Sequence, residues 1–231
     1  MQNKKNDFFI LNMFEKVSRG ESTSFLTKAE YQRVVSFLHK EKKSYQIFIP
    51  FPECEKKILY KDIFPKVKLY KIISSFPLKH SDILGALSSL QIDFHLFGDI
   101  IMREDSYIYL LEEMEPYIVN TLSYIGKNKV KWEEVELDVL KEYQREYEEY
   151  TYSVASTRID LVFSKITHIN RSKIDTYLHQ KEIVINEEFI NKSSYLLKEG
   201  DIFSIRKYGK YKVDKIEETK SSKRITLKKY K

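Results

Sequence analysis

Two arginines stand where two short helices are predicted to begin in the C-terminal third of the chain. Arg171 follows Asn170, a residue type that often caps a helix, and Arg158 opens the preceding helix. An arginine in a first turn opposes the helix dipole, so it does not serve helix stability. A phosphate bound at such a helix start would offset the cost through charge-assisted hydrogen bonds. The pattern therefore favours an anion-binding face.

Further cations and an alternative accompany this interpretation. Lys165 and Lys173 can add positive charge if the two helices pack side by side. In the alternative, Arg158 pairs with Asp160 or Asp175 and only ties the domain together.

No catalytic residue is predicted. Ser, His and Asp adjoin in KHSD (79–82), but neighbours at a helix start point in different directions, whereas a triad must converge in space. We interpret His80 and Asp82 as polar groups of a helix start. The paired carboxylates at 133–134 and 148–149 lie in a polar connector that excludes no water, so general acid–base work is not expected.

Cofactor and metal motifs are also missing from the sequence. The six glycines include no Gly-x-Gly pair, so a phosphate-cradling loop is not expected. One cysteine, Cys54, and five scattered histidines give no zinc-site spacing. We predict no cofactor, no metal ion and no small-molecule substrate.

The positive charge of the chain is concentrated at one end. The net charge is +6, and residues 206–231 contain 11 Lys and Arg against 3 Asp and Glu. This distribution favours a polyanionic partner, and the alternative is a solvated tail that only aids solubility. The single cysteine excludes an intramolecular disulfide, and no apolar run could span a bilayer. The first twenty residues read as an amphipathic helix, so we expect a cytoplasmic protein with no membrane contact.

The hydrophobic pattern predicts an α+β protein of three domains. Residues 1–64 form a small α+β unit whose second helix starts at Thr27. Residues 65–154 show the order β-α-β-β-α-β of a ferredoxin-like (RRM-like) domain, followed by an acidic connector. Its second helix is expected to end at Gly126, and EEYTYSV (148–154) is a candidate edge strand. Residues 155–231 form two short helices, a small sheet and the basic end.

The third domain resembles the RNA-binding domain named after ribosomal protein S-four. That family has an Arg-x-Asp helix start, a Ser-Arg or Asn-Arg helix start, a Val-x-Val-Asn strand and a Gly-Asp-x-Ile-x-Val-Arg strand, and similar motifs follow here in the same order over roughly fifty residues. The matching positions are Arg158, Asp160, Asn170, Arg171, Asn186, Gly200, Asp201, Ile205 and Arg206. Lys181-Glu182 and Glu187 stand where the family often has glycine. The resemblance implies RNA contacts, which we expect at Arg158, Lys165, Asn170, Arg171, Ser172, Lys173, Lys181, Arg206, Lys207 and Lys210.

The central segment resembles the YlmH family. HSDILGALSSLQIDFHLFGDII (80–101) is similar to that family's signature HRDxLGxLxxLGIxRxxxGDI, with departures at Ser81, Gln91 and Phe94. With the S-four-type domain, the resemblance spans roughly residues 45–213. It implies a non-enzymatic, ribosome-associated protein that contacts ribosomal RNA and transfer RNA on the large subunit. The implied role is rescue or quality control of stalled large subunits. The alternatives are an RNA-modifying enzyme with unrecognised chemistry and an interaction scaffold linked to cell division.

Overall fold

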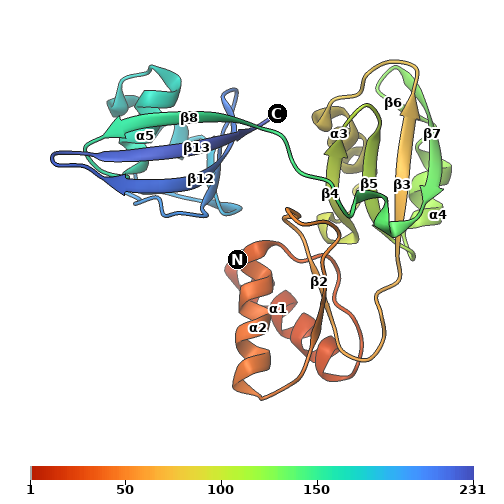
Figure 1. The fold of residues 1–231 in the computed structure, drawn as a ribbon. Coiled ribbons are helices and arrows are strands. Elements are labelled where there is room, and N and C mark those ends of the chain that lie inside the picture. Colours follow the sequence, from red (N-terminus) through yellow and green to blue (C-terminus); the bar gives the residue numbers. More distant parts are fainter. Residues whose placement is uncertain (1) are drawn as a thin grey trace. The chain divides into compact units, whose positions relative to one another are not determined.

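The computed structural model describes residues 2–231, which fall into two compact units (Figure 1). The N-terminal unit runs up to Gln144, and the C-terminal unit covers Arg145–Lys231. Each unit has its own hydrophobic core and is described by itself. Both combine helices with antiparallel sheets, so the predicted α+β class is confirmed.

The N-terminal unit begins with two helices and a short hairpin, α1 (Gln2–Ser18), α2 (Lys28–Lys40), β1 (Gln46–Phe48) and β2 (Ile58–Tyr60). Thr27 caps α2, as predicted. Its hydroxyl accepts from the Glu30 N–H at 3.4 Å, and its own N–H donates to the Glu30 carboxylate at 3.0 Å. This reciprocal pair satisfies two N–H groups that the helix cannot satisfy itself.

The central part of the same unit has the predicted β-α-β-β-α-β order with one added strand. Its elements are β3 (Val67–Ser74), α3 (His80–Ser89), η1 (Phe94–Leu96), β4 (Phe97–Met102), β5 (Ser106–Leu111), α4 (Glu115–Thr121), β6 (Tyr124–Ile125), β7 (Asn128–Val135) and η2 (Leu137–Leu140). The sheet order is β4-β5-β3-β7-β6, and every pair is antiparallel. The prediction that the second helix ends at Gly126 was wrong. The helix ends at Thr121, and Gly126, with φ +60°, turns the β6–β7 hairpin.

One face of this sheet packs against α3 and α4, and the other packs against the N-terminal segment. On the second face, Phe25, Phe51 and Ile58 share a core with Leu69 of β3 and Tyr109 of β5. The Tyr109 side chain is fully buried, and its hydroxyl donates to the Pro50 carbonyl at 2.9 Å. The sheet face that would otherwise be open is therefore a second core.

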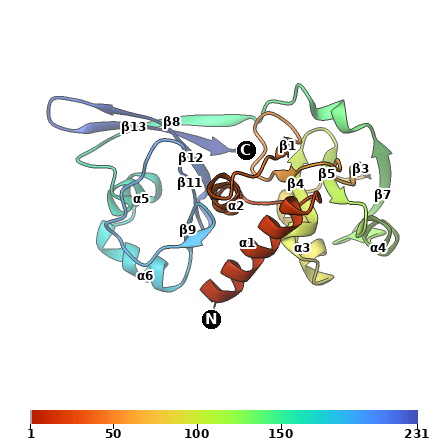
Figure 2. The ribbon, with the colours of Figure 1, turned by 90° about the horizontal axis from the view of Figure 1, so that it is seen from below.

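The C-terminal unit packs two helices on a six-stranded antiparallel sheet of order β10-β9-β11-β12-β13-β8 (Figure 2). Its elements are β8 (Tyr147–Val154), α5 (Ile159–Thr167), η3 (Arg171–Lys173), α6 (Ile174–His179), β9 (Ile183–Ile185), β10 (Glu188–Phe189), β11 (Ile202–Ile205), β12 (Gly209–Glu218) and β13 (Lys223–Tyr230). Residues from both helices, including Val162, Phe163, Ile174 and Leu178, share a core with the inner face of the sheet.

Two features of this unit correct the sequence analysis. Residues 148–154 were assigned to the central domain, but β8 pairs with β13 along its whole length and so belongs to the C-terminal unit. The division lies after Gln144 rather than after Val154. The basic end is also folded. Residues 209–230 form the β12–β13 hairpin, in which Tyr211, Val213, Ile225 and Leu227 are buried.

Candidate RNA-binding surface

The predicted helix start at Asn170 is present and is held by buried residues behind it. The Asn170 side-chain oxygen accepts from the Ser172 N–H at 3.0 Å and so caps the turn η3, which leads into α6. Ile174 and Leu178 anchor α6 in the core, whereas Arg171, Ser172 and Lys173 are exposed. The cap and the anchors position three polar side chains on the surface at a fixed place.

Arg158 forms an ion pair with Asp160, as the alternative interpretation of this residue described. It occupies the N-cap position of α5, and its Nε and Nη2 atoms donate to the Asp160 carboxylate, both at 3.0 Å. This hydrogen bonding raises the pKa of Arg158 further above its usual value. Asp160 is only 6 % exposed and also accepts from the Leu161 N–H. The ion pair therefore joins two residues at the start of α5. RNA contact by Arg158 stays a prediction.

The other predicted cations fall into separate groups. Lys165 is exposed in the last turn of α5, against which η3 packs. Lys181 and Arg206 come together beyond the ends of β9 and β11, because the Arg206 N–H donates to the Glu182 carbonyl at 2.9 Å. The Arg206 guanidinium pairs with the Glu182 carboxylate at 3.3 Å. The exposed Lys207 follows in the same turn.

Lys210 lies elsewhere. It is the second residue of β12 and stands opposite Ser204 in the ladder, on the face of the sheet that points away from the core. Its Nζ is 5.1 Å from the centre of the Tyr230 ring. The structure therefore does not bring Lys210 together with Arg171 on one face.

Several motif residues of the third domain have structural roles that the sequence did not disclose. The Asn186 amide donates to the Asp201 carboxylate at 2.9 Å and accepts from the Ile202 N–H at 2.9 Å. Asp201 also accepts from the Lys198 N–H, so it fixes the turn before β11. Lys181 and Glu187 adopt φ values of +55° and +69°. These are left-handed conformations that favour glycine, and the turns form without it.

Comparisons with known proteins identify the central part. Residues 66–139 match the family model described as "Putative RNA-binding domain in YlmH". The resemblance to the YlmH family is confirmed. The chain is also 29% identical over 155 residues to "Ribosome-associated protein quality control protein P2" of Bacillus subtilis (strain 168). That match covers 66% of this chain and 60% of the relative. A solved structure, "Cell division protein ylmH from Streptococcus pneumoniae", is similar with a TM-score of 0.48 and 17% identity, over 59% of this chain and 92% of that one.

The residues that match the YlmH signature have local structural roles here. The Asp82 carboxylate accepts from the Lys79 N–H at 2.9 Å, so it belongs to the start of α3 as predicted. Asp99 accepts from the N–H groups of Glu55 and Lys56 at 2.7 and 3.2 Å. A Cβ atom on Gly98 would lie 3.0 Å from the Phe25 ring, so glycine permits this close approach. The Gly-Asp pair thus joins the N-terminal segment to the YlmH-type sheet.

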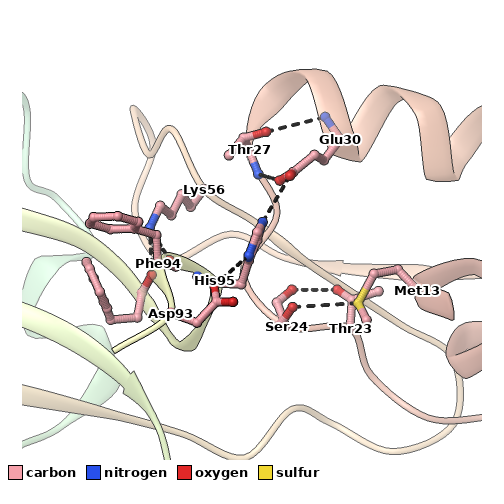
Figure 3. A network of polar contacts seen from close by, with 10 residues as sticks. Met13, Thr23, Ser24, Thr27, Glu30, Lys56, Asp93, Phe94 and His95 are labelled. Carbon is pink, nitrogen blue, oxygen red and sulfur yellow. Dashed lines mark hydrogen bonds and ion pairs between the residues drawn. The ribbon is translucent and has the colours of Figure 1, made fainter. Parts of the chain in front are cut away.

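His95, which lies within the same signature just before β4, belongs to a polar network that links η1 to the start of α2 (Figure 3). Its Nε2 is 2.9 Å from the Glu30 carboxylate, and its Nδ1 is 2.7 Å from the Asp93 carboxylate. Burial alone lowers the pKa of His95, but the hydrogen bonds and charges of both carboxylates outweigh it and raise the pKa above 6.5. Because both ring nitrogens have carboxylate partners, we interpret His95 as structural rather than catalytic.

The stability of the N-terminal unit should fall as the pH rises above about 6.5. The folded state holds the His95 proton more tightly than the unfolded chain does, so the stabilisation is complete below that pH and is lost through the raised pKa. Urea unfolding followed by the fluorescence of Trp132, the single tryptophan, measures this between about pH 6 and pH 8. The variant His95→Gln should lose that pH dependence, and His39→Gln should keep it. Equal pH profiles for His95→Gln and the parent would contradict the assignment.

The stability that the two carboxylates of the network contribute depends on pH in the opposite direction. Burial raises the pKa of Glu30 and Asp93, but hydrogen bonds with His95 and the backbone outweigh it. The pKa of Glu30 therefore lies below its usual value of 4.5, and the pKa of Asp93 lies below its usual value of 3.8. Their stabilisation is present above those values and is lost as the pH falls through the lowered pKa.

Within residues 2–231, no helix is long and apolar enough to cross a membrane. The same residues contain no group of three or more His, Cys, Asp or Glu side chains that could hold a metal ion.

Proposed function

We propose that this chain is a non-enzymatic RNA-binding protein of the ribosome that takes part in quality control of stalled large subunits. The observation that carries the proposal is the match of residues 66–139 to the YlmH RNA-binding-domain family. The Bacillus subtilis relative, named as a ribosome-associated quality control protein, supports the same setting. The aligned region covers less than two thirds of that relative, so its activity and partners come to this chain as part of the proposal.

Within this function, the C-terminal unit contacts ribosomal RNA and transfer RNA through the exposed side of η3 and α5. Arg171, Ser172, Lys173 and Lys165 supply the contacts, with Asn170 holding the turn in place. Lys181, Arg206 and Lys207 extend the positive surface beyond β9 and β11. Contacts of this kind mainly bind phosphate, so they position the protein on folded RNA rather than read its sequence.

Crosslinking in cells tests the function directly. The tagged full-length protein is crosslinked to RNA, and the attached RNA is sequenced. We expect reads concentrated on large-subunit ribosomal RNA and on transfer RNA. Reads distributed like total cellular RNA would refute the ribosomal assignment. A modified nucleoside produced by the purified protein on bulk RNA, detected by mass spectrometry, would refute the non-enzymatic part.

A further inference from the structure

The six-stranded sheet of the C-terminal unit has a second face, which points away from α5 and α6 (Figure 2). Tyr211 and Leu227 are buried on the helix side, and alternate residues of a strand point to opposite faces. The neighbouring positions of the same strands therefore lie on the outer face. Directly opposed residues share a face, and the register pairs Lys212 with Lys228 and Tyr230 with Tyr147 there.

The outer face gathers two tyrosines and three cations into one set of contacts, which we call the outer cluster. It consists of Arg145, Tyr147, Lys210, Lys228 and Tyr230. The two rings meet edge to face, with centres 5.1 Å apart. The Nζ atom of Lys210 is 5.1 Å and the Cζ atom of Arg145 is 5.2 Å from the centre of the Tyr230 ring. The Nζ atom of Lys228 is 6.0 Å from the centre of the Tyr147 ring.

The charges around the outer cluster favour an anionic partner. Lys212 stands directly opposite Lys228 in the ladder, an arrangement of like charges that destabilises a sheet. Asp214 pairs with Lys228 at 2.9 Å, and Glu149 stands on the other side of Lys228. Around the outer cluster, two carboxylates stand among four cations, which are Arg145, Lys210, Lys212 and Lys228. The positive excess that remains is not required for the stability of the sheet.

Partly exposed aromatic rings among cations on a sheet face suit a nucleic acid with unstacked bases. Single strands bind where bases stack on aromatic side chains and cations follow the backbone. The bases of a duplex are already stacked on each other and cannot reach a ring. Lysine side chains are long and rotatable, so Lys210 and Lys228 can move from a ring to a phosphate when a base arrives.

We propose that the outer cluster binds single-stranded RNA, with bases stacked on Tyr147 and Tyr230 and phosphates held by Arg145, Lys210 and Lys228. This goes beyond the proposed function by adding a second site. Arg171 lies on η3, which packs with the helices on the other side of the sheet, so neither site depends on the other. With both sites occupied, the unit holds a folded RNA surface and an adjacent single strand at once.

Binding of a fluorescent oligouridine of about twelve nucleotides to the full-length protein tests the proposal by anisotropy. Tyr230→Leu should weaken binding about tenfold, because stacking on the ring is lost, and Tyr230→Phe should keep it. The matched control is Tyr150→Leu, which removes a tyrosine from β8 on the other face and should leave binding unchanged. Oligouridine binding by Tyr230→Leu equal to the parent overturns the proposal.

A second measurement needs no variant. An oligonucleotide with 4-thiouridine, crosslinked to the unaltered protein, should attach to peptides that contain Tyr147 or Tyr230. Crosslinks confined to α5 and α6 overturn the proposal. Arg171→Glu separates the two sites, because it should weaken ribosome binding and leave oligouridine binding unchanged. Loss of ribosome binding in Arg171→Glu with full oligouridine binding in Tyr230→Leu would leave the proposed function standing and end this second site.

Discussion

Changing Arg171 to glutamate is expected to weaken the binding of the full-length protein to large ribosomal subunits by about 30- to 140-fold, or roughly 2–3 kcal/mol. The change removes one charge-assisted contact and places a carboxylate where a phosphate would lie. The fold should survive. Arg171 is exposed, an acid near a helix start suits the helix dipole, and the buried Ile174 and Leu178 still anchor α6.

Co-sedimentation with purified large subunits at several salt concentrations measures this effect. The logarithm of the binding constant should also depend less steeply on salt, by about 0.7–0.9 for one lost phosphate contact. Arg19→Glu makes the same charge change at an exposed site after α1 and serves as the control. If Arg171→Glu co-sediments like the parent, the RNA-binding face does not include η3.

Local features of the fold could be predicted because their causes lie within a few residues. Thr27 and Asn170 were recognised as helix caps from residue type and the apolar residues that follow, and both accept the expected N–H groups. The order of strands and helices after residue 66 followed from alternation and helical periodicity in the same way. A capped start with a buried anchor behind it is also what places Arg171 on the surface.

Features that depend on distant partners could not be predicted. Residues 147–154 pair with residues 223–230, far along the chain, so nothing nearby shows that they belong to the C-terminal sheet. The β12–β13 hairpin was not predicted, because its many lysines are also typical of a solvated tail. Tyr211 and Val213 nevertheless alternate with lysines as in a strand. For Arg158 the sequence left a near partner, Asp160, and a distant one, Asp175, and the structure shows the pairing with Asp160.

The covered face of the YlmH-type sheet is the structural feature with the largest consequence for RNA binding. In RRM domains, aromatic residues on the open sheet face stack with RNA bases. Here that face carries Tyr109 and Leu69, both fully buried under Phe25, Phe51 and Ile58. Such a core cannot open without unfolding its surroundings. Under the proposed function, RNA contacts by the central part would have to come from elsewhere on its surface.

Replacing Phe25 by alanine is accordingly expected to lower the free energy of unfolding of the N-terminal unit by about 3–5 kcal/mol. Phe25 is fully buried, and its ring lies against Gly98 and Tyr109, so its loss leaves a cavity in the shared core. Phe8→Ala is the matched control, because that ring is 75% exposed and its removal should change stability by no more than about 0.5 kcal/mol. Urea unfolding followed by the fluorescence of Trp132, which lies on β7 in the same unit, compares the two variants with the parent. A loss below about 1 kcal/mol for Phe25→Ala would mean that the segment covers the sheet only loosely. Base stacking on Tyr109 would then become possible again.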